Sequence, residues 1–502
     1  MKTKSILRGQ SNTHQSFWVA AGSASSFLFT IVSAAILSRY FDKQEYGTYR
    51  QIIFVYNTLL VVFSAGLPKV FAYFLPKYSI SEGKDIVKKI TGILIIFGAV
   101  FSKALFFSSN LIARVLNNQE LARGLKYFSP IPILLLPTLG IEGIFATYKK
   151  TIYIAIYNIL TRTSMLIFIV TPVILLEGSY IHAIYGWIVV SIISFIIAIV
   201  FKHIPYRKTN RVKTSLSFKD IFSYSLPLMT ASLAGLAIRS ADQFYISRYF
   251  GTEVFAEYSN GFIQLPFVSM VTGAAAMVLM PQYSKLFHDK AHHSEILTLW
   301  NNAIKKSALI IYPIVMFAIF NAGSIIVLLY SKTYSNSIIY FKIALILNFF
   351  NIITVAPVLL SRGKSAYYSK IQILFAFIKW TGGYIMILIT SNPVAIAIYS
   401  VAVNIVLIFV FLVKIGNLLD VSLNKLIPLS KISLIVLHTF IVISIIKILE
   451  ISFLDGANLI IKLITNLFLF TGLLLVSSKL FRINYLVVIK PIINRNKDEK
   501  QI

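Results

Sequence analysis

Two stretches of the sequence match each other: SRYFDKQEYGTY at residues 38–49 and SRYFGTEVFAEY at residues 247–258. Their first four residues are identical. The alignment continues without gaps through an aromatic residue, a small residue and a tyrosine. These are Tyr46, Gly47 and Tyr49 in the first copy and Phe255, Ala256 and Tyr258 in the second. A further match follows in the next apolar run, where Pro76 and Tyr78 correspond to Pro281 and Tyr283. The chain is therefore predicted to contain an internal duplication.

The composition requires a membrane around the chain. Hydrophobic residues make up 57% of the 502 residues and charged residues only 13%, which leaves too few polar groups to cover a soluble globule. Apolar runs of about 20 residues recur, each long enough to cross a hydrocarbon core of about 30 Å as a helix. Helices satisfy their own backbone in lipid. We predict an all-α polytopic membrane protein whose first run, beginning near Phe17, is retained because no small-residue cleavage site follows it.

About fourteen transmembrane helices are predicted from these runs. The first six lie near residues 16–38, 50–74, 90–108, 126–147, 152–176 and 180–203. The next six lie near residues 220–246, 256–280, 306–330, 337–360, 366–390 and 393–415. Two further spans lie near residues 432–450 and 458–477.

The charges of the loops predict the orientation. Lys and Arg concentrate in alternate loops, roughly three to one over the opposite loops, and the linker Lys202 to Lys219 is the richest. The basic set includes Lys2, Lys4, Arg8 and the tail from Lys479 to Lys500. Because cytoplasmic loops retain positive charge, both termini are placed in the cytoplasm. The net charge of +29 thus reflects topology, and no nucleic-acid partner is expected because the basic residues are spread over short loops.

The repeat predicts the domain organisation. Both copies begin on the same side of the membrane, so the repeat is parallel, with its axis along the membrane normal. Residues 1–204 form an N-lobe of six helices, residues 205–417 a C-lobe of six, and residues 418–502 two additional helices and a basic cytoplasmic tail. Two six-helix bundles facing each other would enclose a central cavity.

The repeated motif also resembles a known family. Arg39-Tyr40-Phe41, a polar turn and then Glu45-Tyr46-Gly47-Thr48-Tyr49 resemble the polysaccharide transporters of the multidrug/oligosaccharidyl-lipid/polysaccharide exporter superfamily. The second copy, Ala241 to Gly251, is similar to that family's seventh-helix pattern. It departs from the pattern at Gln243, where a basic residue is common, and at Ala256, where Gly is usual. The sharp motifs cover helices 1, 2, 7 and 8, and the topology resembles the family over the twelve-helix body.

This resemblance implies a function and partners. Members are V-shaped, two-lobed flippases for undecaprenyl-diphosphate-linked repeat units, of the O-antigen (Wzx) or capsular kind, in the bacterial cytoplasmic membrane. The implied partners are a lipid-linked oligosaccharide, membrane lipids, and the polymerase and chain-length machinery of lipopolysaccharide or capsule biosynthesis.

Two charged residues lie inside the seventh predicted span. Arg239 and Asp242 are three residues apart and so share one helix face. A charge in the bilayer costs about 2.5 to 3.5 kcal/mol, so such residues normally face a cavity or a partner. Small and polar residues extend this face and the corresponding face of the first span: Ser232, Gly235, Ser23, Ser26, Thr30 and Ser33. The alternative is that Arg239 and Asp242 pair with each other and the small residues allow close helix packing.

Three further basic residues lie well inside predicted spans: Lys69, Arg162 and Lys379. Cationic side chains in a poorly solvated cavity attract a diphosphate strongly, so we predict that they bind substrate with Arg239. For each one, the alternative is snorkelling to the membrane interface or pairing with a carbonyl at a helix end.

Gln51 and Asn260 are equivalent by the repeat and are predicted to hydrogen-bond sugars, with Tyr49 and Tyr258 available for stacking. The alternative for the tyrosines is the aromatic belt at the membrane interface.

No cofactor is expected. The chain has no cysteine, which excludes disulfides and thiolate metal sites, and its His288, His292 and His293 have no matched carboxylates. A Walker-type glycine loop is absent from the sequence, so ATP hydrolysis is not expected. Energy would come from an ion gradient, the membrane potential or consumption of the product.

Two other classes of function stay open. A lipid II-type or drug or cation exporter of the same superfamily would share this architecture, although a basic cavity disfavours cations. A multispan polysaccharide polymerase or ligase is an enzyme of a different class. The sequence shows neither a long outward loop nor a paired nucleophile and base, so we predict that the protein is not an enzyme.

Overall fold

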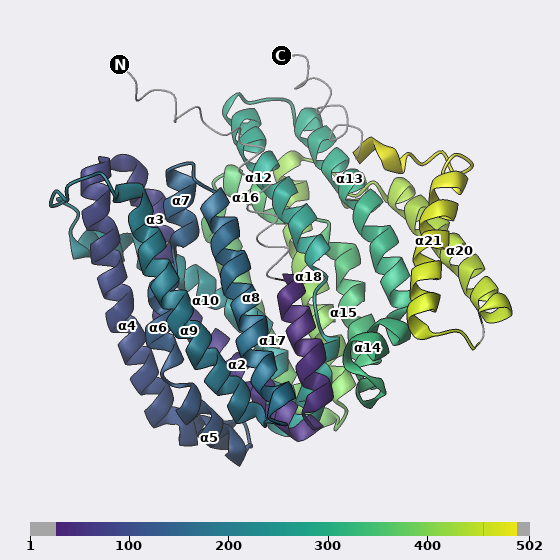
Figure 1. Ribbon diagram of the computed structural model, residues 1–502. Coiled ribbons are helices and arrows are strands. Elements are labelled where there is room, and N and C mark those ends of the chain that lie inside the picture. The colour runs from purple at the N-terminus through teal and green to yellow at the C-terminus, as the bar shows by residue number, and fades with distance from the viewer. Residues whose placement is uncertain (1–26, 455, 489–502) are drawn as a thin grey trace. The chain divides into compact units, whose positions relative to one another are not determined.

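The computed structural model describes residues 27–454 and 456–488, and helices make up the regular structure of these residues (Figure 1). The predicted all-α class is confirmed. Twelve helices in this part of the chain are long and apolar enough to cross a membrane. The count of fourteen stays a prediction: the first run is described only over Phe27–Tyr40, and α12 (Pro266–His288) is not among the twelve.

Several predicted features lie outside the described residues. They are Lys2, Lys4, Arg8, Ser23, Ser26 and the part of the basic tail from Lys490 onward.

The chain divides into two compact units, the first ending at Glu257 and the second beginning at Tyr258. The helices of the first unit after Phe27–Tyr40 are α2 (Lys43–Ser64), α3 (Pro68–Phe74), α4 (Ile80–Val115), α5 (Gln119–Phe128), α6 (Ile131–Leu135), α7 (Ile141–Thr147), α8 (Ile152–Leu175), α9 (Tyr180–His203) and α10 (Phe218–Tyr249). Helix α10 contacts α2 and α3, and therefore groups with the helices that precede it. The predicted division into lobes at residues 1–204 and 205–417 is based on the internal repeat, and it stays a prediction.

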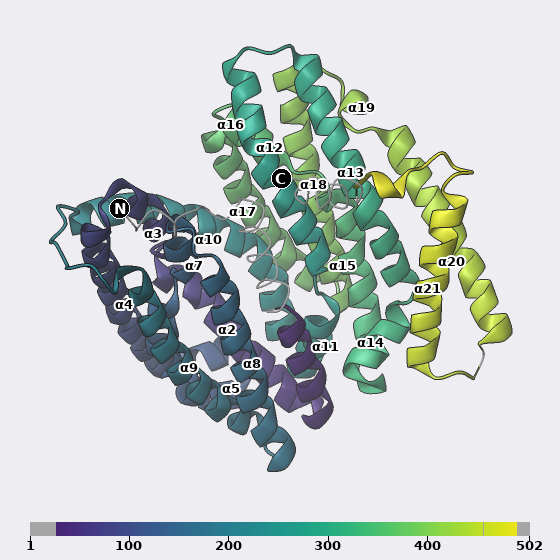
Figure 2. The same ribbon diagram turned by 45° about the horizontal axis from the view of Figure 1, so that its top comes forward.

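Close helix packing in the first unit depends on small residues. Helices α8 and α9 lie side by side in both ribbon views (Figures 1 and 2). A Cβ atom at Gly186 of α9 would lie 2.1 Å from the backbone oxygen of Phe168 in α8. Only a residue without a side chain lets the two backbones approach this closely, as is usual between helices in lipid.

The second unit continues from α11 (Thr252–Gly261), which crosses the division between the units. Its other helices are α12, α13 (His293–Phe320), α14 (Ala322–Tyr330), α15 (Ser337–Asn351), α16 (Val355–Ser361), α17 (Ser365–Ile389), α18 (Pro393–Leu419), α19 (Leu423–Leu426), α20 (Leu429–Phe453) and α21 (Leu459–Ser477). The last pair, coloured yellow in Figure 1, packs through α20 on α13 and through α21 on α14.

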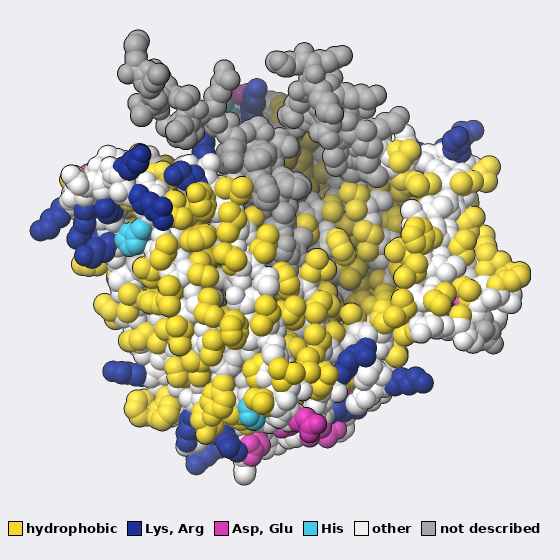
Figure 3. Space-filling model, in the orientation of Figure 1, with side chains coloured by type: hydrophobic (Ala, Val, Ile, Leu, Met, Phe, Trp, Pro, Cys, Tyr) yellow, Lys and Arg dark blue, Asp and Glu magenta, His cyan; other side chains and the backbone are white. Residues whose placement is uncertain are grey.

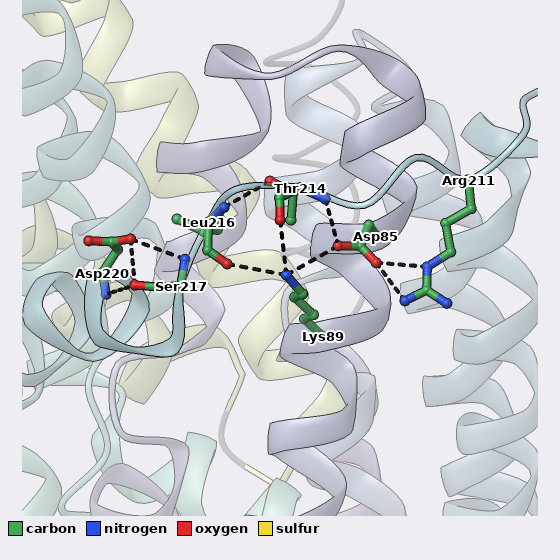
Figure 4. A network of polar contacts seen from close by, with 7 residues as sticks. All are labelled: Asp85, Lys89, Arg211, Thr214, Leu216, Ser217 and Asp220. Carbon is green, nitrogen blue, oxygen red and sulfur yellow. Dashed lines mark hydrogen bonds and ion pairs between the residues drawn. The ribbon is translucent and has the colours of Figure 1, made fainter.

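The linker between α9 and α10 is tied to the start of α4 (Figure 4). The fully buried carboxylate of Asp85 accepts from Nε of Arg211 at 2.7 Å and from the backbone N–H of Thr214 at 3.0 Å. Lys89 lies 3.3 Å from the same carboxylate and donates to the backbone oxygens of Thr214 and Leu216. The linker is therefore held by these polar contacts, and its Tyr206 and Leu216 are also buried in the apolar core of this unit.

Basic and hydrophobic side chains occupy different parts of the surface of the first unit. In Figure 3, Lys and Arg side chains of this unit gather at its upper edge, beside the start of α4, and hydrophobic side chains cover the helices below. Large apolar residues on α4 are widely exposed, among them Ile96 at 61% and Phe107 at 79%. Such exposure is costly in water and favourable in lipid, which agrees with a multi-pass membrane protein.

Candidate functional site

Two adjoining cavities lie within the first unit. The narrow cavity has a volume of about 240 Å³ and the wide cavity about 610 Å³. They share Tyr56, Asn57, Arg162, Met165 and Trp187 as lining residues. Because these residues line both spaces, the two cavities adjoin and make up one candidate site among the helices of this unit.

The wide cavity brings together two of the predicted cationic residues. Lys69 reaches it from α3 and Arg162 from α8. Nη1 of Arg162 lies 3.3 Å from the thioether sulfur of Met165, and within the described part of the chain neither cation forms an ion pair. Two cations without carboxylate partners in an apolar helix bundle attract an anionic ligand.

The narrow cavity is aromatic. Trp187 of α9 donates its indole N–H to the hydroxyl of Tyr49 at 2.9 Å, which fixes both rings in the wall. Thr30 and Ser33 of the first helix also line this cavity, and Arg50 lies in the same wall. Aromatic faces beside hydroxyl groups suit the apolar and polar faces of a sugar ring.

A break between α2 and α3 positions Lys69. Ala65 and Gly66 both adopt positive φ angles, of 47° and 68°, which ends α2 and redirects the chain. Pro68 then begins α3, since its fixed φ suits the first turn of a helix. Lys69 follows directly, so the break presents its side chain to the cavity rather than along a continuous helix.

A second break, between α6 and α7, forms another part of the wall. Leu136–Thr138 is a short 3₁₀ turn, and Gly140 has a φ of 88°. A Cβ atom at Gly140 would lie 2.2 Å from the ring of Phe71, so glycine is required there for two independent reasons. The break frees backbone carbonyls that a continuous helix would use.

Lys202 of α9 satisfies those carbonyls. Its ammonium donates to the backbone oxygens of Pro137 at 2.7 Å and Leu139 at 2.8 Å, and lies 3.4 Å from the hydroxyl of Thr91. The residue is 1% exposed. It was expected to begin the basic linker, but the structure makes it a buried helix residue that holds the wall of the wide cavity.

Gln51 lies in a buried network instead of the cavity wall. Its side-chain nitrogen donates to Ser247 at 2.8 Å, and its oxygen accepts from Asn118 at 2.6 Å. It is not among the residues that line either cavity. Asn260, its repeat equivalent, is buried in α11. Sugar binding by these two amides stays a prediction.

The remaining predicted residues lie elsewhere. Arg239 is exposed on α10 and forms no ion pair with any residue that the structure describes. Asp242 is buried, and accepts from the backbone N–H of Gln243. Lys379 is buried in α17 of the second unit. Neither Arg239 nor Asp242 lines the two cavities of the first unit.

Some lining residues were not predicted. Glu142, Asn57 and Asn158 all face the wide cavity. A signal for Glu142 was present in the sequence, because a carboxylate inside a predicted span is as unusual as a cation. Among the described residues, no group of three or more His, Asp or Glu side chains is placed to hold a metal ion.

Comparisons with known proteins agree on family and fold. A family model described as "Polysaccharide biosynthesis protein" matches residues 36–339, more than half of the chain. Among curated proteins, none matches the sequence. A structure of the lipid II flippase MurJ in an inward closed conformation is similar, with a TM-score of 0.68 and 15% identity over 92% of this chain and 99% of that chain.

A second similar structure is an inward-facing multidrug resistance MATE family transporter of the MOP superfamily, with a TM-score of 0.66 and 14% identity over 80% of this chain and 96% of that chain. At these identities the two structures establish the fold alone. The chain belongs to the polysaccharide biosynthesis protein family, and it has the fold of the MOP superfamily transporters.

Proposed function

We propose that this protein is a flippase that translocates undecaprenyl-diphosphate-linked oligosaccharide repeat units across the bacterial cytoplasmic membrane, for O-antigen or capsule biosynthesis. The family and the transporter fold support a transport role in polysaccharide biosynthesis. The observation that carries the substrate class is the wide cavity, where Lys69 and Arg162 present unpaired positive charge to a space of about 610 Å³.

The chemistry of these residues fits the two parts of such a substrate. Lys69 offers a mobile point charge and Arg162 a planar fork, and both suit phosphate oxygens. The aromatic rings and hydroxyls of the narrow cavity offer stacking and hydrogen bonds to a saccharide. Binding of the headgroup in the cavity, with the lipid tail left in the bilayer, removes the cost of passing polar sugars through hydrocarbon.

Transport follows by alternating access, without covalent chemistry by this chain. The two predicted lobes would rock between inward-open and outward-open states, so that the substrate is accessible from one side of the membrane at a time. An ion gradient or the membrane potential would supply the energy. The flipped product would pass to polymerase and chain-length proteins. Four other predicted residues would contribute to substrate binding in conformations that bring them to the substrate: Arg239, Lys379, Gln51 and Asn260.

The test is export in cells that depend on this protein for surface polysaccharide. Arg162→Ala and Lys69→Ala are each expected to lower export about tenfold or more at unchanged protein level, since a charge-assisted contact contributes about 1.5 to 3 kcal/mol. Arg162→Lys should retain part of the activity because the charge is kept and only the fork is lost.

The matched control is Lys103→Ala. Lys103 is an exposed cation on α4 that lines neither cavity, so its removal should leave export unchanged. Wild-type export by both the Arg162→Ala and Lys69→Ala proteins would contradict the proposal. Export of organic cations instead of saccharides would favour a drug exporter.

A further inference from the structure

The charged residues that line the two cavities do not all have the same sign. Three are basic: Arg50 in the narrow cavity, Lys69 in the wide cavity and Arg162 in both. Glu142, in the wide cavity, is the acidic residue among the described lining residues. Lys69 and Arg162, the two cations of the wide cavity, suit the two negative charges that a diphosphate joining a lipid to a sugar carries at neutral pH.

Glu142 lies in the first turn of α7, where a carboxylate is favourable to the helix dipole, and its side chain also lines the wide cavity. Its side chain is exposed to the wide cavity, and it forms no ion pair within the part of the chain that the structure describes. A carboxylate inside a helix bundle is costly unless it serves a function.

The position of Glu142 is nevertheless firmly held. It lies in the first turn of α7, directly after the break at Gly140. Packing of Gly140 on Phe71 and the hydrogen bonds from Lys202 to Pro137 and Leu139 hold that break. Because the backbone at Glu142 is held, its carboxylate stays at this wall of the cavity within the reach of one side chain, and it repels an anion that enters there.

We infer that Glu142 determines specificity by excluding a second anionic group, so that this protein selects lipid diphosphates whose cavity-bound sugars are neutral. This inference rests on the proposed function. In a partly desolvated cavity, a sugar carboxylate within about 6 Å of Glu142 would be repelled strongly enough to weaken binding at least about tenfold. A neutral sugar meets no such penalty.

A pair of ligands that differ in one group tests this directly. Undecaprenyl diphosphate carrying glucose and the same lipid carrying glucuronic acid differ only by a hydroxymethyl group against a carboxylate. Their affinities are measured with the purified full-length protein in nanodiscs. We expect wild-type protein to prefer the glucosyl lipid at least about tenfold, and Glu142→Gln to bring the two affinities within about threefold of each other.

Two variants serve as controls. Glu142→Asp keeps the charge and should keep the preference. Glu253→Gln removes an exposed carboxylate on α11 that lines neither cavity, and should also leave the preference unchanged.

The outcomes separate the inference from the function. If wild-type protein binds the glucosyl lipid but shows no preference, or if Glu142→Gln keeps the preference, the inference is overturned and the proposed function stands. Loss of glucosyl-lipid binding in Glu142→Gln would also overturn it, because Glu142 would then be a direct ligand. Failure of wild-type protein to bind either lipid would overturn both.

Discussion

At the scale of single residues, Lys202 shows how a buried cation can be stable without a carboxylate. Its partners are backbone oxygens freed by the break before α7, and the ring of Phe71 lies 5.0 Å from its ammonium. Charged donors form stronger hydrogen bonds to carbonyls than neutral donors do, and a low-dielectric surrounding strengthens them further. Lys202 therefore supplies the hydrogen-bond donors that the carbonyls at the break need, and those carbonyls supply the acceptors that the buried ammonium needs.

Replacement of Lys202 by Met tests this mutual compensation. Met keeps an apolar stem of similar length but leaves the oxygens of Pro137 and Leu139 without this donor, at about 1 to 3 kcal/mol for each buried group. We expect a melting temperature in detergent several degrees below that of wild type. Lys219→Met, at an exposed position early in α10, should melt with the wild type. Equal melting temperatures for the two variants would show that Lys202 does not hold the break.

At the scale of elements, polar side chains at the start of α4 fasten the connection between α9 and α10. Asp85 accepts from a side chain and from a backbone N–H of the linker. A second tie comes from Lys84, whose ammonium donates to the backbone oxygen of Thr209 at 2.8 Å. Capping boxes at Ser79 and Ser217 begin the two helices that the linker joins in space, α4 and α10. The part of this segment between the buried Tyr206 and Leu216 opens locally more readily when a polar tie is lost.

Asp85→Asn is expected to release the linker while the helices stay folded. The substitution keeps the shape of the side chain but removes both ion pairs, with Arg211 and Lys89. Trypsin should then cut after the basic residues of the linker about tenfold faster, because the local opening costs less. Asp289→Asn, in an exposed loop, is the control. An unchanged cleavage rate would mean that other contacts hold the linker.

At the scale of the whole molecule, charge and hydropathy together give the expected orientation in the membrane. The helices expose large apolar side chains along their length, whereas the linker and the start of α4 carry the basic residues. Because positive charge is retained in the cytoplasm, we expect the linker and both termini to lie on the cytoplasmic side.

Reporter fusions test this orientation. A fluorescent protein inserted at Lys208 should fluoresce, as expected for the cytoplasm. Alkaline phosphatase inserted after Gly178, between α8 and α9, should be active, as expected for the opposite side. Both positions lie outside the membrane-spanning helices, so insertion should be tolerated. An active phosphatase at Lys208 would reverse the topology and place the basic loops outside.

The sequence by itself determined the class of this protein, because hydropathy and loop charge are sums over many residues and need no knowledge of contacts. The Ser-Arg-Tyr-Phe repeat likewise identified the exporter superfamily, which the family model and the fold confirm. Intramembrane charge also singled out Lys69 and Arg162, since an isolated cation in an apolar run is visible without a structure.

The tertiary structure alone decided which of those charges share a cavity. Arg239 met the same criterion of intramembrane charge as Lys69 and Arg162, yet it lines neither cavity. Gln51 was selected through the repeat, and its amide forms hydrogen bonds within the protein. The breaks before α3 and α7 depend on single backbone conformations and on Lys202, a residue distant in sequence. Hydropathy is an average over a whole span and contains no information on such local geometry. The wall that presents Glu142 could therefore be found only from the tertiary structure.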